Sequence, residues 1–282
     1  HTGIQGIRRI DNSEFLRFEA AVGQIADFTI HHALLEICEA NFSELMLCYE
    51  NAQERFRNTH QIDETINDEI LNEINRLLIN YLSSFRTMID HYQTRCTRLD
   101  RGGSQYLGTF KVSTANIYDA SFSYRFIYQL RNYVQHCGLP VGCVGAEVYK
   151  NEAGDTVAQL SVYFDRDSLL TRFNKWGKIK NELEAQPARI EISVHLVEFH
   201  QRVLELYRAL VQMELDIVNG ARLYLSGLVS EVHSQLPGAR PLIVDFSQVS
   251  AAGGNLPARV IPIKELARIQ EVEKTINSNH GE

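Results

Sequence analysis

The sequence has few cysteines, and none of them is spaced as zinc ligands usually are. Five are present, and they form no Cys-x-x-Cys pair: Cys38, Cys48, Cys96, Cys137 and Cys143. An odd number of cysteines, most with apolar neighbours, is typical of buried thiols in a reducing compartment. We therefore expect a cytoplasmic protein that uses neither a metal nor another cofactor.

Long apolar runs and several common enzyme motifs are also missing. No stretch approaches the roughly 18 uninterrupted apolar residues of a membrane helix, so we expect no membrane partner. The sequence contains no phosphate-binding glycine loop, no HExxH and no GxSxG, so P-loop NTPases, zincin proteases and α/β-hydrolases lose their usual sequence support. It has no internal repeat or low-complexity block.

The composition that remains is that of a globular protein with an uneven charge. The 282 residues are 44% hydrophobic and 22% charged, which fits one large domain or two modest ones. The net charge is −7, but residues 86–136 hold seven basic and three acidic side chains, a local charge of +4 against −11 elsewhere. A basic patch in this region would suit an RNA strand, although charge runs are more often solvated helix faces.

Helical periodicity governs three long stretches. The first runs from His31 to Arg57. Residues 4–28 before it give no clear pattern, and a short helix from Ser13 and a strand or helix turn near Val22–Phe28 both stay open. The second, Thr65–Leu99, keeps apolar residues three and four apart over its whole length without Gly or Pro. The third extends from Ile190 to Gln235, and its opening, Ile190–Val194, fits a strand as well as a helix.

The pattern changes after Pro140. Gly142–Lys150 and Asp155–Phe164 approach strict alternation around a turn, which predicts a β-hairpin. Short helices follow, and the C-terminal part predicts a strand at Pro241–Phe246, a loop with Gly253 and Gly254, and a terminal helix within Ala258–Gln270.

The predicted fold class is therefore mainly α, an antiparallel helical bundle with a small β-hairpin or sheet. We assign residues 4–140 to a helical region and residues 141–282 to an α+β region that completes or extends the bundle, unless the two form one continuous domain.

The functional prediction rests on the stretch Asp119–Pro140, which reads as one helix. Asp119 or Ser121 can cap its start, and Gly138 followed by Leu and Pro predicts its end. One face is apolar, and the other carries an aromatic and polar strip: Tyr124, Arg125, Tyr128, Arg131, Asn132, Gln135 and His136. A histidine in the last helical turn lies near unpaired carbonyls that favour its imidazolium form, and it can titrate near neutrality.

The segment Arg131-Asn132-Tyr133-Val134-Gln135-His136 resembles the signature motif of the HEPN superfamily. That motif consists of an arginine, a polar residue, several variable residues and a histidine. Many members of that superfamily are RNA-cutting toxins of bacterial defence and toxin–antitoxin systems. The resemblance covers mainly residues 65–139, where it implies a long antiparallel pair of helices. It further implies a homodimer in which two copies of the motif helix face one groove, without a metal.

Carried over to this chain, the resemblance gives each residue a role. Arg131 would hold the scissile phosphate, and His136 would be the general acid or base. Asn132 would orient either group. RNA would further contact Tyr128, Gln135 and Arg125. The implied function is an endoribonuclease of phage defence or growth arrest that leaves 2′,3′-cyclic phosphate and 5′-hydroxyl ends, with an antitoxin or sensor protein as a further partner.

Two other hypotheses remain open at this point. The first is a non-catalytic helical dimer that binds a partner protein or RNA, in which Arg131 and His136 serve structure. The second is a metal enzyme that uses His31, His32, His91 or His195, although their spacing forms no known ligand set. Both copies of Arg131 and His136 within about 10 Å of one another across a two-fold axis, in an open groove, would favour the ribonuclease, since phosphate and acid–base groups must reach one reacting centre. A buried His136 bonded to a backbone carbonyl would count against it.

Overall fold

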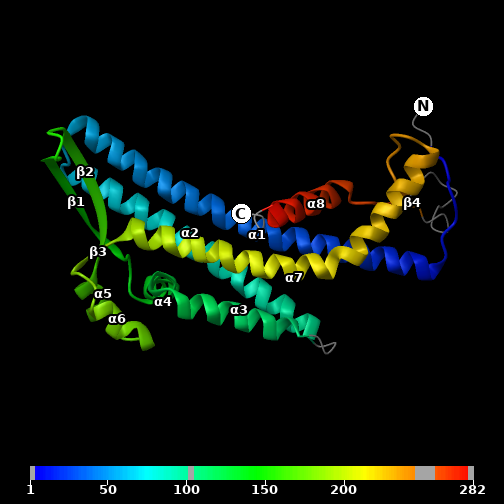
Figure 1. Ribbon diagram of the computed structural model, residues 1–282, viewed down its shortest axis with the longest axis horizontal. Helices are drawn as coiled ribbons and strands as arrows, with labels where there is room; N and C mark the ends of the chain where they lie inside the picture. The colour runs from blue at the N-terminus through cyan, green and yellow to red at the C-terminus, as the bar shows by residue number, and fades with distance from the viewer. Residues whose placement is uncertain (1–3, 101–104, 245–257, 279–282) are drawn as a thin grey trace, which may run out of the picture. The chain divides into compact units, whose positions relative to one another are not determined.

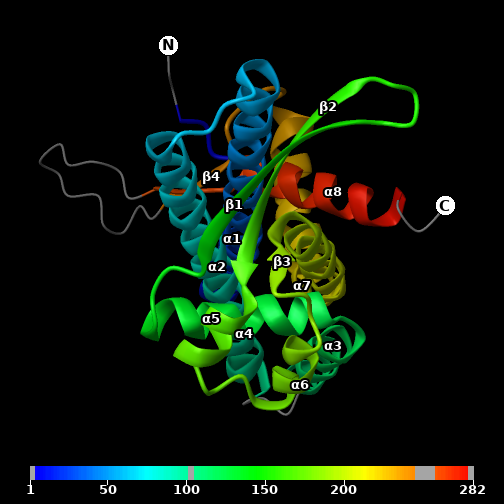
Figure 2. The same ribbon diagram turned by 90° about the vertical axis from the view of Figure 1, so that its left-hand side faces the viewer.

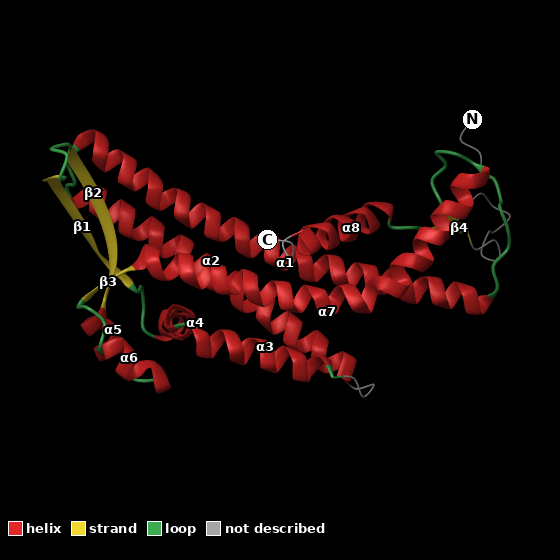
Figure 3. Ribbon diagram, viewed as in Figure 1, coloured by secondary structure: helices red, strands yellow, loops and turns green. Residues whose placement is uncertain are grey.

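The computed structural model describes residues 4–100, 105–244 and 258–278, and most of them are helical (Figures 1 and 3). The helices, in chain order, are α1 (Asn12–Thr59), α2 (Glu64–Asp100), α3 (Tyr106–Ala120), α4 (Phe122–His136), α5 (Arg166–Arg172), α6 (Lys180–Glu184), α7 (Ile192–Gln235) and α8 (Ile263–Ser278). A 3₁₀ turn, Gly177–Ile179, precedes α6.

The strands form two small antiparallel sheets. They are β1 (Val141–Lys150), β2 (Thr156–Asp165), β3 (Arg189–Glu191), β4 (Leu242–Val244) and β5 (Ala258–Val260). The order is β1-β2-β3 in one sheet, and β4 pairs with β5 in the other. The predicted class, mainly α with a small β element, is confirmed.

The residues group into two compact units that are discontinuous in sequence. Residues 33–210 form the central unit, and the described residues of 1–32 and 211–282 form the terminal unit. The long helices α1 and α7 each contribute to both. These units do not test whether residues 4–140 can fold apart from residues 141–282, and that division stays a prediction.

In the central unit, α3 and not α4 runs back alongside α2. The Asp100 carboxylate at the end of α2 accepts hydrogen bonds from the backbone N–H groups of Tyr106 and Leu107, at 3.0 and 2.9 Å, and so caps α3. Figure 1 shows α4 end-on while α3 lies in the plane of the view, and Figure 2 shows α4 from the side. The expected antiparallel pairing of α2 with the motif helix is therefore wrong, because the extended backbone of Ser121 turns the chain between α3 and α4.

The hairpin predicted after Pro140 is confirmed as β1 and β2. The side chain of Asn151 closes its turn by accepting from the Asp155 N–H at 2.8 Å, and Gly154 has φ +87°. Beyond the short β3, the amide of Gln53 in α1 acts in place of a further strand. It donates to the Ala158 carbonyl at 2.9 Å and accepts from the Leu160 N–H at 2.8 Å. These two main-chain groups at the edge of β2 are therefore paired without a neighbouring strand.

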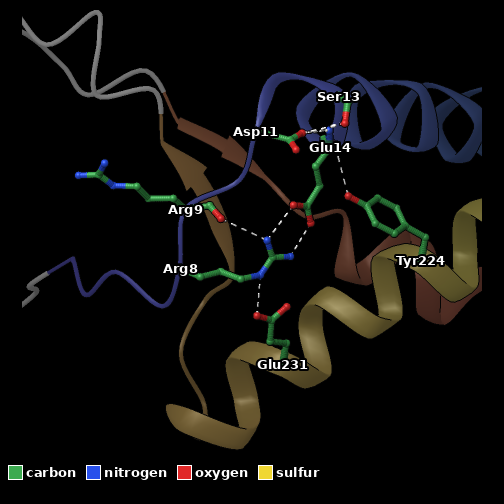
Figure 4. A network of polar contacts seen from close by, with 7 residues as sticks. All are labelled: Arg8, Arg9, Asp11, Ser13, Glu14, Tyr224 and Glu231. Atoms are coloured by element: carbon green, nitrogen blue, oxygen red, sulfur yellow. Dashed lines mark hydrogen bonds and ion pairs between the residues drawn. The ribbon is translucent and has the colours of Figure 1, made fainter.

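In the terminal unit, α1 begins at Asn12, one residue before the short helix from Ser13 that the sequence left open. The helix expected from His31 is the continuation of this one helix, not a separate element. Figure 4 shows the polar network that fixes this start. Asp11 Oδ1 accepts from the Glu14 N–H at 2.8 Å, and Arg8 links the Glu14 carboxylate to Glu231 of α7, with an Nε–Oε1 distance of 2.7 Å. A cap and two ion pairs stabilise a helix start that hydrophobic spacing alone did not mark.

The C-terminal predictions are confirmed in part. A strand occupies Leu242–Val244 and the terminal helix is α8, but the segment before α8 also contains β5, which pairs with β4. The predicted loop with Gly253 and Gly254 lies outside the described residues. The segment Ile190–Val194, which fitted a strand as well as a helix, is divided between the two. Ile190 belongs to β3, and α7 begins at Ile192.

Candidate functional site

The motif helix has the boundaries that its sequence predicts. Ser121 is its N-cap and accepts from the Tyr124 N–H at 3.1 Å, while Gly138 with φ +128° follows its end. Tyr124, expected on the polar strip, is instead buried. The core behind the helix includes Trp176, which packs on Phe126 with ring centroids 6.0 Å apart. These contacts fix which face of α4 remains open.

A pocket of about 240 Å³ lies between that face and α2. Its walls are Phe85 and Arg86 from α2 and Tyr128, Arg131 and Asn132 from α4. Three of these five residues were predicted as site residues from the sequence. Of the two from α2, Arg86 was noted only as a polar residue of its helix and Phe85 only as part of its apolar spacing. The pocket therefore combines two guanidinium groups, one amide and two aromatic rings.

Two neighbouring side chains hold Arg86 in a defined position in the lining of this pocket. Its Nε lies 3.0 Å from Asp90 Oδ2 and its Nη2 lies 2.7 Å from Asp90 Oδ1. The carboxylate therefore binds the guanidinium in a bidentate manner on its Nε side. Its Nη1 donates to the Tyr128 hydroxyl, and its Cζ lies 5.7 Å from the centre of the Tyr128 ring. The contact with Tyr128 couples α2 to the motif helix.

Arg131 and His136 lie differently with respect to this pocket. Arg131 lines it, and within the described residues its guanidinium has no hydrogen bond or ion pair. His136 is exposed at the last position of α4 and is not part of the lining. It is not bonded to a backbone carbonyl of any described residue. A single chain thus does not bring the two predicted catalytic groups together.

The other predicted site residues have varied surroundings. Asn132 donates to Gln129 at 2.9 Å and makes no bond to His136. Gln135 is exposed. Arg125 caps the end of α3, donating to the carbonyls of Tyr118 and Asp119, and its Nη2 lies 2.6 Å from Glu182. The guanidinium of Arg125 therefore helps to hold α3 and α6 in place.

A polar cluster that the sequence did not predict holds the start of α4 against α7. Glu198 of α7 accepts from the hydroxyls of Ser121 and Ser123, at 2.5 and 2.7 Å, and these bonds lower the pKa of its carboxyl. Ser123 Oγ also lies 2.7 Å from His195 Nδ1. Since the Ser123 proton goes to Glu198, the neutral His195 ring must donate from Nδ1. Burial lowers the pKa of His195, which favours this neutral form.

A second buried histidine, His200, lies in the aromatic core of the central unit. Its ring stacks on Phe42 with centroids 3.8 Å apart, and its Nδ1 lies 2.9 Å from the Tyr81 hydroxyl. Burial lowers the pKa of His200 to about 4, so the ring is neutral near pH 7. In the neutral ring, Nδ1 of His200 can accept the hydrogen bond that the Tyr81 hydroxyl donates.

In the part of the chain that the structure describes, no group of three or more His, Cys, Asp or Glu side chains is placed to hold a metal ion. All five cysteines are free thiols, and burial raises the pKa of Cys38 to about 12. No described helix combines the length and the hydropathy that a membrane span requires.

Comparison with family models, with curated proteins and with solved structures finds no match to this chain.

Proposed function

We propose that this protein is a metal-independent endoribonuclease of the HEPN type that acts as a homodimer, with Arg131 binding the scissile phosphate and His136 serving as general acid or base. One observation carries the proposal. The motif helix presents, in a pocket, an arginine whose guanidinium has no partner among the described residues, and it carries a solvent-accessible histidine at its end. An unpaired guanidinium in a partly aromatic pocket is suited to a phosphate oxygen.

The homodimer is a necessary part of the proposal. Within one chain, His136 does not line the pocket that Arg131 lines. A phosphate and an acid–base group must reach one reacting centre, so a second copy of α4 would have to supply His136 to the pocket of its partner. Phage defence or growth arrest in the cytoplasm, with an antitoxin or sensor protein as regulator, is the setting that the resemblance gives.

The test is cleavage of mixed cellular RNA by purified protein in the presence of a chelator. We expect wild-type protein to leave 2′,3′-cyclic phosphate and 5′-hydroxyl ends. Arg131→Ala and His136→Ala should each lower the rate by about 100-fold or more, the usual size of an acid–base or oxyanion contribution. Arg76→Ala, which removes an exposed cation from α2, is the matched control and should cut as wild type does.

Chemical rescue makes the role of His136 specific. Added imidazole should restore part of the activity of His136→Ala and none of that of Arg131→Ala, since only the first lacks a proton-transfer group. Equal cleavage by all variants would assign the activity to another site or to a contaminant.

The second candidate is a non-catalytic helical dimer that binds RNA or a partner protein. It is favoured by the separation of His136 from the pocket and by the use of Arg125 in holding α3 and α6. RNA binding without cleavage, lost in Arg131→Ala and kept in His136→Ala, would select this function over the first.

A further inference from the structure

The pocket between α2 and α4 contains hydrogen-bond donors from Arg86 in addition to those of the motif residues. Arg86 has five N–H groups, of which two go to Asp90 and one goes to Tyr128. One N–H on each terminal nitrogen is left without a partner among the described residues. Arg131, which has no partner there at all, lines the same pocket. Two guanidinium groups therefore offer unused donors to one small space.

The carboxylate of Asp90 gives Arg86 its position without closing off the pocket. It binds the Nε side of the guanidinium, and it is not part of the pocket lining. Asp90 is thus a positioning residue that holds the donors of Arg86 in place before any ligand arrives, which lowers the entropy lost on binding. The two arginines and Asp90 together leave one net positive charge at the pocket.

The rest of the lining selects among anions. Tyr128 supplies a half-buried aromatic ring, and Phe85, which is 2% exposed, packs behind it. Asn132 donates one N–H to Gln129, and its carbonyl oxygen stays available. Aromatic side chains stack on nucleobases, and a side-chain amide can pair with the edge of a base. A volume of about 240 Å³ is below the range of drug-sized pockets and suits one small group.

We infer that this pocket binds the phosphate of one nucleotide at Arg86 and Arg131, with the heteroaromatic base of that nucleotide against the ring of Tyr128. The nucleotide can be free or an unpaired residue of an RNA strand, since both carry the same groups. The inference deepens the proposed function, because Arg131 belongs to both. It does not require that RNA be cut.

The test uses a fluorescent single-stranded oligonucleotide in which every 2′-hydroxyl is methylated, so that no cleavage can follow binding. We expect Tyr128→Leu and Arg86→Gln each to weaken binding by roughly tenfold, the size of one lost stacking or charge-assisted contact. Arg76→Gln removes the same charge from α2 outside the pocket and should bind as wild type does. Tyr128→Phe keeps the ring, so it should bind more tightly than Tyr128→Leu.

Competition separates the two sources of the ligand and the competing ligand classes. Displacement of the probe by a nucleoside monophosphate at lower concentration than by inorganic phosphate supports the inference, and points to a free nucleotide if the monophosphate alone saturates the site. Displacement only by single-stranded RNA supports it for an RNA residue. Equal displacement by phosphate, stronger displacement by a phosphotyrosine peptide, or equal binding of a duplex would overturn it.

Binding and cleavage distinguish this inference from the proposed function. Probe binding that depends on Arg86 and Tyr128, in a protein that never cuts RNA, would uphold the nucleotide pocket and refute the nuclease. Cleavage that depends on Arg131 and His136, with probe binding unchanged in Arg86→Gln and Tyr128→Leu, would refute the pocket alone. Thermal unfolding of each variant shows that a loss of binding is not a loss of fold.

Discussion

Asn75 holds both main-chain groups of Val141 with one buried amide. Its Nδ2 donates to the Val141 carbonyl at 2.9 Å, and its Oδ1 accepts from the Val141 N–H at 3.1 Å. The residue is 2% exposed, so neither main-chain group would find water in its place. This pair of bonds fixes the first residue of β1 on α2, directly after the motif helix.

We predict that Asn75→Ala lowers the free energy of unfolding by roughly 2 to 4 kcal/mol, since two buried polar groups lose their partners. Asn72→Ala on the exposed face of the same helix is the matched control and should change stability by less than about 0.5 kcal/mol. Urea unfolding of both variants checks this. A loss in Asn75→Ala no larger than that in Asn72→Ala would show that the bonds add no net stability.

His200 should make the stability of the protein depend on pH in a defined direction. Burial lowers its pKa from 6.5 to about 4 in the folded chain, so between these values the unfolded chain binds a proton that the folded chain does not. The free energy of unfolding therefore falls as the pH is lowered through this window, and is unaffected by this group above it.

The expected loss from His200 is roughly 2 to 3 kcal/mol between neutral pH and the lower end of the window. It appears as the difference between wild type and His200→Gln in urea unfolding at a series of pH values. Parallel pH dependences for the two proteins would mean that His200 is protonated as readily in the fold as in the unfolded chain.

At the scale of elements, the start of α4 depends on a serine that serves two partners. Ser121 Oγ accepts from the Tyr124 N–H and donates to Glu198 of α7. One side chain thus begins the motif helix and ties it to the helix behind it. Ser121 therefore contributes to the position of α4 and of the pocket residues that it carries.

We expect Ser121→Ala to lower the free energy of unfolding by about 1 to 2 kcal/mol, from the lost cap and the lost bond to Glu198. Ser83→Ala, at an exposed helical position on α2, should have almost no effect. Thermal unfolding by circular dichroism checks both. If Ser121→Ala is as stable as Ser83→Ala, the cap is not what holds the start of α4.

The boundaries of single elements could be predicted from the sequence where the signal is local. Ser121 and Gly138 bound α4, and Asn151 with Gly154 turns the hairpin, because each acts within a few residues of its own position. The start of α1 stayed open because no regular apolar pattern follows its local cap, Asp11, and because Arg8 supports it through Glu231, which is 223 positions away in the sequence.

Long-range pairings could not be predicted in the same way. Arg86 and Tyr128 are 42 positions apart, and Ser121 and Glu198 are 77 apart. The sequence marks each of these residues as polar or aromatic but does not say which of many others it meets. The candidate site was therefore predicted in part: the α4 residues of the pocket were assigned to it from the sequence, and the α2 residues were not assigned to it.

At the scale of the whole molecule, the proposed nuclease must be larger than one chain. We expect light scattering to give twice the 32.2 kDa mass of the chain, since a second α4 has to bring His136 to the pocket of its partner. A mixture of Arg131→Ala and His136→Ala chains should regain part of the activity, because a mixed dimer contains one intact pair of groups. A monomer that still cuts RNA would remove the dimer from the mechanism.

Trp176 is the chain's one tryptophan, and it packs against the motif helix α4. Its indole is 1% exposed, donates to the Leu169 carbonyl and packs on Phe126 and Tyr133 of α4. The intrinsic fluorescence of the protein is therefore an optical readout of how α4 is seated, available without any label. A shift in emission on adding a nucleotide would reveal movement of the motif helix in real time, in stopped-flow as well as at equilibrium.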